Sequence, residues 1–158
     1  MQLAIREILQ FGDKLLRKVS RKVKNIDEET LRIVQDLKDT LYSSSGVGLS
    51  APQIGILRRI IFIDLRKENT NPVTLINPRI VKKMGRNEGA EGCLSYNGYE
   101  GIVVRPKKVI VEGQDINGNE VKYNAEGIFA RAFCHEIDHL DGVLYTDKAK
   151  KIYKVDEF

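Results

Sequence analysis

The sequence predicts an α+β fold in which mixed or antiparallel β-sheets pack around a C-terminal helix, with an amphipathic helix near the N-terminus. A helical pattern over residues 25–43 comes first, and several short β-branched segments follow it. A second helical pattern over residues 127–140 comes after them. The 158 residues contain no internal repeat and no linker-like break, so we expect residues 1–158 to form a single domain.

The first helix is predicted from the segment NIDEETLRIVQDLKDTLYS. Asp27 can cap its N-terminus, and the acidic residues of the first turn suit the helix dipole. The serines and glycines of SSSGVGLSAPQIG, together with Pro52, predict that the helix ends before this segment. The apolar stripe of the helix is expected to consist of Leu31, Val34, Leu37 and Leu41.

Short segments between the two helices predict strands. RRIIFIDLR is brief and rich in β-branched residues, which favours a buried strand. VTLINP and RIVKK are two further candidates, separated by Pro78. The longer segment over residues 107–127 predicts a hairpin that turns at Asn117-Gly118, because this dipeptide favours tight hairpin turns.

The second helix is predicted from GIFARAFCHEIDHL. Gly142 follows the last apolar position and suits the end of a helix. We expect this helix to pack on the sheet, because a helix that follows several strands must bury its apolar face against them. The residues of that face are Ile128, Ala132, Phe133, Ile137 and Leu140.

The composition is typical of a globular protein, with 42% hydrophobic and 30% charged residues. The N-terminal stretch lacks the apolar core of a secretory signal, and no segment approaches the roughly 20 apolar residues of a membrane span. We therefore expect a cytoplasmic protein. There Cys93 and Cys134 would be free thiols or metal ligands, whereas a secreted protein could pair them. The net charge of +4 permits a polyanionic partner without requiring one.

His135 and His139, the only histidines of the chain, lie four residues apart in FCHEIDHLDG. At about 100° per residue they share one face of the predicted helix, so both imidazoles can bind one metal ion. Glu136 is rotated by about 100° from His135, a position that suits a general base acting on metal-bound water. The segment therefore predicts a metal site with an acid–base group beside it.

The metal site needs a third protein ligand, and no histidine is left to supply it. The long zinc-protease motif would have a histidine where this chain has Tyr145. Asp156 or Glu157, in the charged C-terminal segment, are alternatives, and Cys93 in EGCLS is another. Residue chemistry favours Cys93, because a thiolate with two imidazoles leaves a fourth position open for water. Cys134 is expected to point aside as a small buried residue.

Three segments together resemble the signature motifs of bacterial peptide deformylases: GVGLSAPQIG (46–55), EGCLS (91–95) and HEIDHLDG (135–142). Their order and separation match those of the family, and ILQFGDKLLRKVS and LINPRI are similar to its connecting sequence. The resemblance covers nearly the whole chain. It implies a metal-dependent hydrolase that removes the N-formyl group from the initiator methionine of newly synthesised polypeptides and releases formate.

Matched position by position, the resemblance also implies roles for single residues. Hydroxide on the metal would attack the formyl carbon, with Glu136 as general acid/base. Gln53 and the backbone N–H of Leu94 would donate to the developing oxyanion. The metal ligands would be Cys93, His135 and His139. The substrate pocket would be shaped by Gly46, Val47, Gly48, Ile128, Arg131 and Ala132.

The resemblance implies one divalent metal ion per chain, with Fe²⁺ expected in the cell and Zn²⁺, Ni²⁺ or Co²⁺ able to occupy the site. The partners would be N-formylmethionyl nascent peptides and, transiently, the ribosome, with no membrane and no obligate partner protein. The basic residues Lys148, Lys150, Lys151 and Lys154 are compatible with contact to ribosomal RNA. A solvated C-terminal segment explains these lysines equally well.

The chain departs from the family pattern at Asn97, where many members have proline, and at Cys134, where glutamine is common. Asp138 is hypothesised to pair with Arg105 and brace the metal-binding helix; the alternative is that both are solvated surface charges. Two other functions share part of the site. A peptidase that cuts internal bonds would not depend on Cys93. A zinc-stabilised binding module would need a closed site, and no fourth protein ligand is evident.

Overall fold

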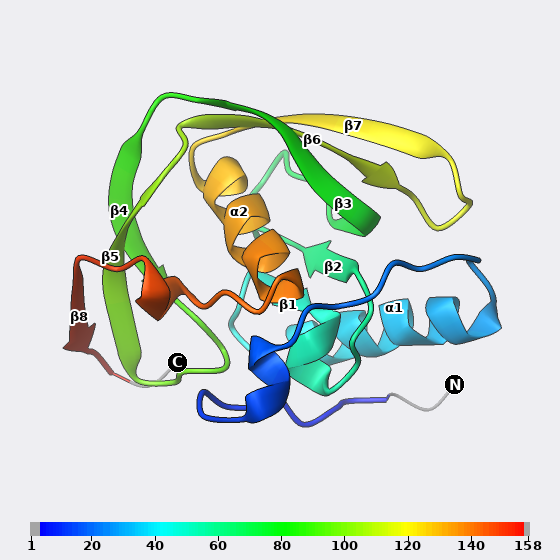
Figure 1. The fold of residues 1–158 in the computed structure, drawn as a ribbon, viewed down its shortest axis with the longest axis horizontal. Helices are drawn as coiled ribbons and strands as arrows, with labels where there is room; N and C mark the ends of the chain where they lie inside the picture. The colour runs from blue at the N-terminus through cyan, green and yellow to red at the C-terminus, as the bar shows by residue number, and fades with distance from the viewer. Residues whose placement is uncertain (1–3, 157–158) are drawn as a thin grey trace.

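The computed structural model describes residues 4–156, and its elements confirm the α+β class. Helix α2 (Ile128–Leu140) lies near the centre of the molecule, with strands above it and to its left in Figure 1. Helix α1 (Glu28–Tyr42) lies below it in the same view. Three short 3₁₀ helices complete the helical elements of the described residues: η1 (Lys14–Arg17), η2 (Ala51–Ile54) and η3 (Tyr145–Asp147).

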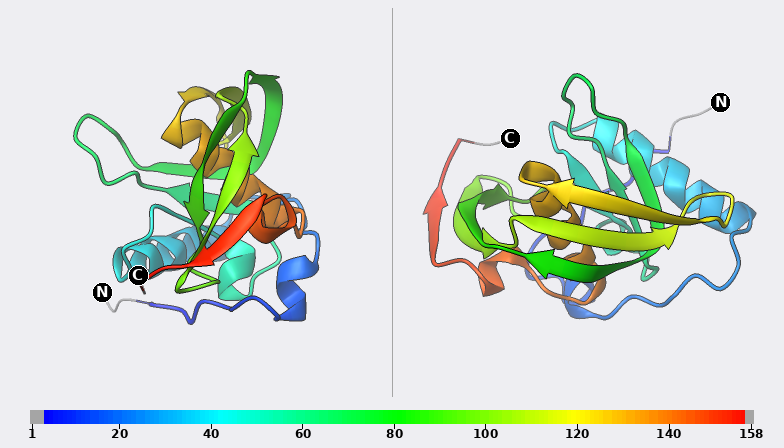
Figure 2. Two further views of the ribbon diagram at one scale, coloured as in Figure 1. Left: turned by 90° about the vertical axis from the view of Figure 1, so that its left-hand side faces the viewer. Right: turned by 90° about the horizontal axis from the view of Figure 1, so that it is seen from above.

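The strands form two antiparallel sheets. The larger sheet has the order β1-β2-β3-β6-β7 and the smaller one has the order β4-β5-β8. Figure 2 shows the smaller sheet, with β8 in red beside β5. The strands are β1 (Gly48–Ser50), β2 (Ile60–Ile63), β3 (Val73–Met84), β4 (Asn87–Gly92), β5 (Tyr99–Arg105), β6 (Lys108–Gln114), β7 (Glu120–Glu126) and β8 (Lys151–Lys154).

Strand β2 lies between the two α-helices, which confirms the buried strand predicted from RRIIFIDLR. Ile61 and Ile63 pack in the cluster of apolar side chains around α2. Ile60 and Phe62 pack in the second cluster, on the side of α1. Successive side chains of a strand point to opposite faces, so a strand covered on both faces has to be apolar at every position. The predicted packing of α2 on the sheet is confirmed by the same contacts.

Helix α1 begins as predicted, because the side chain of Asp27 accepts a hydrogen bond from the backbone N–H of Thr30 at 3.0 Å. The predicted apolar stripe is wrong at its first position. Leu31 is 43% exposed, whereas Ile33 is 6% exposed and joins the core in its place. Thr30 in the same turn is buried, so Leu31 is exposed because of its position around the helix, on the side that faces away from the core. The other three positions of the stripe are buried: Val34, Leu37 and Leu41.

The predicted break between two strands at Pro78 is also wrong, since β3 continues through this residue from Val73 to Met84. The pairing of β3 with β6 shifts its register between Ile76 and Arg79. Asn77 lies in that shift with a φ of +53°, and its side chain donates to the Val23 carbonyl oxygen at 2.9 Å. A bulge tolerates proline because its residues do not all donate to the ladder.

The predicted hairpin is confirmed as β6 and β7. Its loop closes when the backbone N–H of Gly118 donates to the Asp115 carbonyl oxygen at 3.0 Å, and Gly118 has a φ of +83°. The predicted end of the second helix is confirmed as well, since Gly142 follows α2 with a φ of +73°. Within residues 4–156, neither helix is both long and apolar enough to cross a membrane.

Candidate metal centre

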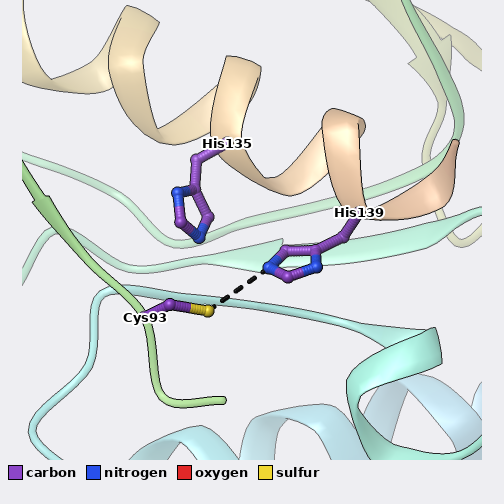
Figure 3. A group of neighbouring side chains, drawn as sticks. All are labelled: Cys93, His135 and His139. Atoms are coloured by element: carbon purple, nitrogen blue, oxygen red, sulfur yellow. Dashed lines mark hydrogen bonds between the residues drawn. The ribbon is translucent and has the colours of Figure 1, made fainter. Parts of the chain in front are cut away.

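The two histidines and one of the two cysteines meet at one point. The potential ligand atoms of Cys93, His135 and His139 all lie within 4.8 Å of one another. The Sγ of Cys93 is 3.4 Å from the Nε2 of His139. Figure 3 shows both imidazoles projecting from α2, each with a ring nitrogen directed toward the space beside the sulfur. The fold therefore brings together residues that are more than forty positions apart in the sequence.

Different parts of the fold hold these side chains. The two histidines lie one turn apart on α2, whose apolar residues anchor it in the core. Cys93 directly follows β4, and the backbone N–H of Tyr96 donates to the Cys93 carbonyl oxygen at 2.9 Å to close a turn. The N–H of Phe11 donates to the Ser95 carbonyl oxygen at 2.8 Å. The N-terminal segment thus braces the turn that presents the thiol.

Glu91 of β4 sets the orientation of His135. Its Oε1 lies 2.9 Å from the Nδ1 of His135, and Nδ1 must be the donor because a carboxylate only accepts. The Nε2 of His135 is then the nitrogen left to bind a metal. Arg105 donates to the two oxygens of Glu91 at 2.7 and 2.9 Å, and Arg131 donates to Oε2 at 2.7 Å. Four hydrogen bonds from three residues therefore hold a carboxylate that is only 6% exposed.

Arg105 extends this network to the outer side of α2. Its Nη1 donates to Oδ2 of Asp138 at 2.6 Å, and the same oxygen is 3.0 Å from the Nζ of Lys148. The predicted pairing of Asp138 with Arg105 is confirmed. The alternative of a solvated arginine is wrong, because Arg105 is 3% exposed. A continuous chain of charged contacts thus connects the surface of α2 with His135.

Burial and neighbouring charges shift the pKa values at the centre in different directions. Burial alone would raise the pKa of Glu91, but hydrogen bonds from Arg105 and His135 hold it well below its usual range. Burial would lower the pKa of His135, but its contacts with Cys93 and Glu91 raise it well above the ordinary value. Burial and the charge of His135 lower the pKa of His139 well below the ordinary value. His139 is therefore a neutral imidazole, the form that binds metals.

Glu136 lies beside the histidines on α2 and lines the pocket described below. It is 4% exposed, and burial is the main cause that raises its pKa to about 7. Its Oε1 has no hydrogen-bond partner among the described residues. Its Oε2 is so close to β1 that a Cβ atom added at Gly48 would come within 2.6 Å. A carboxyl group in these surroundings can exchange protons near neutral pH.

The side-chain amide of Gln53 has a defined orientation. Its Oε1 accepts from the backbone N–H of Ser50 at 3.0 Å, and a backbone N–H cannot accept, so the amide cannot be flipped. Its Nε2 consequently faces the opposite way, donating to the Ser95 hydroxyl at 3.1 Å and lying 3.5 Å from the sulfur of Cys93. An amide N–H therefore points at the centre from the η2 side.

A pocket of about 300 Å³ opens in front of these groups. It lies between residues 45–48, which lead into β1, and residues 90–94 at the end of β4. Both β1 and β4 are edge strands of their sheets. Gln53 and Leu94 line the pocket too. The residues that the resemblance assigns to a substrate pocket all line it: Gly46, Val47, Gly48, Ile128, Arg131 and Ala132. Ile128, expected on the buried face of α2, is instead 48% exposed at this pocket.

The other candidates for a third ligand are not in the group of ligand atoms found within residues 4–156. Tyr145 is buried, but its ring centroid is 6.1 Å from that of His135, and it packs against Cys93 as part of a small apolar cluster. Asp156 is exposed, and Glu157 lies outside the described residues. Cys134 is buried in the core cluster around α2, as expected for a small apolar residue, and both cysteines are free thiols.

Sequence reasoning missed Glu91, the residue that orients His135. A signal for it was present, because residues two apart on a strand face the same side and Glu91 stands two positions before Cys93. It also missed Glu100 of β5, which lines the pocket. No local signal marks Glu100, since its position depends on the pairing of β5 with β4.

The donor set fits a divalent transition metal ion. A thiol and two imidazoles are soft and borderline ligands that suit zinc and ferrous iron. Glu91 leaves the Nε2 of His135 free, and the low pKa of His139 keeps that ring neutral. A cation beside the sulfur would bind the Nε2 of His135, while the Nδ1–H of the same ring keeps its hydrogen bond to Glu91. The orientations and protonation states of the three side chains thus suit the binding of a metal ion between them.

Two histidines on an HExxH helix, a cysteine directly after β4 and a pocket that reaches a buried glutamate are the features of a metallohydrolase of the HExxH class. A family model described as polypeptide deformylase matches residues 5–155. The chain belongs to the polypeptide deformylase family, the enzymes that remove the N-formyl group from the N-terminal methionine. Membership of this family excludes the two alternative functions considered from the sequence, a zinc-stabilised binding module and a peptidase that cuts internal bonds.

Relatives and solved structures agree over nearly the full length. Peptide deformylase 1 of Clostridium acetobutylicum is 48% identical over 146 residues, which cover 92% of this chain and 95% of the relative. A crystal structure of a peptide deformylase from Legionella pneumophila is 40% identical, with a TM-score of 0.89 over 93% of this chain and 87% of that one. A Synechococcus elongatus peptide deformylase in complex with actinonin is 38% identical, with a TM-score of 0.89 over 96% of this chain and 82% of that one.

Proposed function

We propose that Cys93, His135 and His139 bind one divalent metal ion and that this centre hydrolyses the formyl group of N-formylmethionyl peptides. The convergence of the three ligand atoms within 4.8 Å, beside a pocket that Cys93 and His135 line, is the observation that carries the proposal. When bound, the metal supplies Lewis acidity, which polarises a carbonyl group and lowers the pKa of water toward about 7. We propose Fe²⁺ as the metal in the cell, with Zn²⁺, Ni²⁺ or Co²⁺ as substitutes.

Glu136 is proposed as the general acid/base. It accepts a proton from the attacking water and delivers it to the nitrogen of the leaving amine. Its pKa of about 7 supports both transfers, because the best proton-transfer groups have a pKa near the working pH. The unpartnered Oε1 supports the role further, since no other described group competes for it.

Gln53 and the backbone N–H of Leu94 are proposed to donate hydrogen bonds to the oxyanion that develops on the formyl carbon. The fixed orientation of the Gln53 amide supports this role, because a preorganised donor needs no rearrangement during the reaction. The turn that carries Leu94 is held by Gln10, whose Nε2 donates to the Leu94 carbonyl oxygen at 3.1 Å. A donor of this kind contributes about 3 kcal/mol of transition-state stabilisation in comparable enzymes.

The methionine side chain is proposed to enter the pocket between Val47 and the first turns of α2. Ile128 and Ala132 offer apolar surface there, and the aliphatic part of Arg131 adds to it while its guanidinium is held by Glu91. The rest of the peptide would lie extended between β1 and β4, since an edge strand offers backbone groups to an added strand. Gly46 and Gly48 let this chain approach closely.

Nascent chains are the proposed natural substrate, with a transient visit to the ribosome in the cytoplasm, no obligate partner protein, and residues 1–158 acting as one catalytic domain. Lys151 and Lys154 on β8 are exposed and support an interaction with RNA. Lys148 and Lys150 support it less, because ion pairs with Asp138 and a surface glutamate partly neutralise them.

The decisive experiment is formate release from formyl-Met-Ala-Ser by protein purified without oxygen. Rapid release that a chelator abolishes and that added Fe²⁺ restores is expected. Cys93→Ser should lose both the bound metal and the activity, whereas Cys134→Ser, a control at the other buried thiol, should keep both. Actinonin should compete with the peptide if the pocket matches that of the Synechococcus elongatus structure. Metal-replete, folded protein without formate release would overturn the proposal.

A further inference from the structure

Glu100 is a charged residue of the pocket lining to which the proposed mechanism gives no role. It is half-buried on β5 and lines the pocket together with Gly92 and Cys93. In the pairing of β5 with β4, Glu100 stands directly opposite Gly92. Paired residues of an antiparallel ladder project to the same face, and Gly92 has no side chain there. The carboxylate of Glu100 can therefore extend over the end of β4, next to the residue that carries the thiol.

The charge of Glu100 is not compensated in the way that the other pocket charges are. Glu91 is held by two arginines and a histidine, and the charge of Arg131 is neutralised by its ion pair with Glu91. Glu100, in contrast, makes no salt bridge within residues 4–156 and accepts one long hydrogen bond, at 3.3 Å, from the hydroxyl of Tyr153 on β8. A negative charge is thus left facing the pocket.

A formylated peptide cannot match this charge with its own N-terminus, because the formyl group removes the positive charge of the terminal amine. The matching cation must come from a side chain further along the peptide. Lysine and arginine have the length to reach a carboxylate from a neighbouring strand. Glu100 lines the pocket beside Gly92 and Cys93, so a long side chain one or two residues after the methionine has its carboxylate within reach.

We propose that Glu100 makes this enzyme selective for N-formylmethionyl peptides with lysine or arginine at the second or third residue, and selective against acidic residues there. The inference rests on the proposed function of the centre. Glu100 acts as a specificity residue that binds the substrate and takes no part in proton transfer. Its effect therefore belongs mainly in KM, because the ion pair is the same in the ground state and the transition state.

The test compares formate release from C-terminally amidated peptides that differ in one charge. Formyl-Met-Ala-Ser amide is the neutral reference, and lysine, glutamine or glutamate replaces alanine in one series and serine in another. With the wild-type enzyme, kcat/KM for the lysine peptide should exceed that for the glutamate peptide by about fivefold to tenfold in the preferred series. The ratio should fall as salt is raised, because a pair at a pocket rim is screened.

Variants then assign the preference to one residue. Glu100→Gln should bring the lysine-to-glutamate ratio close to one, and Glu100→Lys should invert it. Glu88→Gln is the matched control, because Glu88 lies on β4 with its side chain 54% exposed, pairs with Lys150 and does not line the pocket. This control should keep the wild-type ratio.

The outcomes separate the inference from the proposed function. Release from the neutral peptide with a wild-type ratio near one in both series, or a ratio that Glu100→Gln leaves unchanged, would overturn the inference and leave the deformylase centre standing. If Glu100→Gln fails to fold, the wild-type ratio and its salt dependence still decide the matter. No release from any peptide, the neutral one included, would overturn both.

Discussion

Replacing Gly48 by alanine should slow the chemical step by moving Glu136. The Cβ atom of an alanine at this position would lie 2.6 Å from Oε2 of Glu136. Ordinary contact begins near 3.4 Å, so the carboxylate has to withdraw by about 0.8 Å. Gly48 is not among the glycines with a positive φ, so alanine brings no backbone strain of its own. The perturbation is therefore confined to the position of the carboxylate.

The size of the effect follows from this displacement. A misplacement of about 1 Å in a reacting group costs on the order of 100-fold in rate. We therefore expect kcat to fall by about 30-fold to 100-fold, which corresponds to about 2–3 kcal/mol. KM for formyl-Met-Ala-Ser should change less, because the added methyl group points toward Glu136, whose atoms are its three nearest neighbours, and the backbone of β1 stays available to the peptide. Formate release under saturating peptide measures kcat directly.

A double-mutant cycle with Glu136→Ala checks the cause. Without the carboxylate there is nothing for the methyl group to displace, so Gly48→Ala should alter the residual rate of the Glu136→Ala enzyme by less than about twofold. Bound metal and the thermal midpoint should stay at the wild-type values in Gly48→Ala. An equal loss of kcat in both backgrounds would refute the reasoning, because the loss would then come from the backbone of β1.

Three further predictions concern the network and the stability of the fold. Glu91→Gln should weaken metal binding by about 10-fold to 100-fold in a chelator competition, because Glu91 orients His135. Asp138→Asn should weaken metal binding less but measurably, because Asp138 acts only through Arg105. Unchanged metal affinity in Asp138→Asn would contradict the bracing role. Gly142→Ala should destabilise the protein to denaturant by about 2–4 kcal/mol, because φ is +73° and the new methyl group would collide with the Arg17 carbonyl oxygen. Arg17 lowers the pKa of Asp147, so this pair stabilises the fold above the unfolded carboxyl pKa near 4, and the stabilisation is lost as the pH falls. Asp147→Asn should accordingly cost about 0.5 kcal/mol at pH 7, and the difference should vanish in acid; a difference that persists in acid would contradict the pairing.

The elements with a local signal could be predicted from the sequence alone. The spacing of His135 and His139 placed both on one helix face, and Asn117-Gly118 marked the hairpin turn, because these patterns depend only on neighbouring residues. Cys93 was favoured over the carboxylates for its chemistry, and the family resemblance supported it. Its contact with α2 depends on how β4 packs, which no local pattern encodes.

The elements that were missed depend on pairing across the chain. The segment after Pro78 looked like a new strand, yet the pairing with β6 absorbs the proline in a bulge. Leu31 had the right helical spacing, but the buried face of α1 is centred on Ile33 and Leu37, and spacing alone does not tell which side of an apolar stripe lies against the core. No strand was predicted in the C-terminal lysine-rich segment, yet four of its residues pair with β5 as strand β8, with their lysines exposed to solvent. Intrinsic propensity and hydrophobic periodicity predict which helix or strand a residue belongs to. Whether its side chain is buried depends on the helix or strand that packs against it.

Three glutamates around one pocket show how surroundings divide the work of a single residue type. Glu91 is surrounded by donors, which keep it ionised and make it a fixed acceptor for His135. Glu136 is buried with no donor to one of its oxygens, so its pKa rises to about 7 and it can exchange a proton. Glu100 stands at the rim with a tyrosine as its one hydrogen-bond partner in the described structure, and its charge remains available to a substrate. Exchanging these surroundings would exchange the roles, because the number of donors and the degree of burial decide whether a carboxyl group orients, reacts or selects.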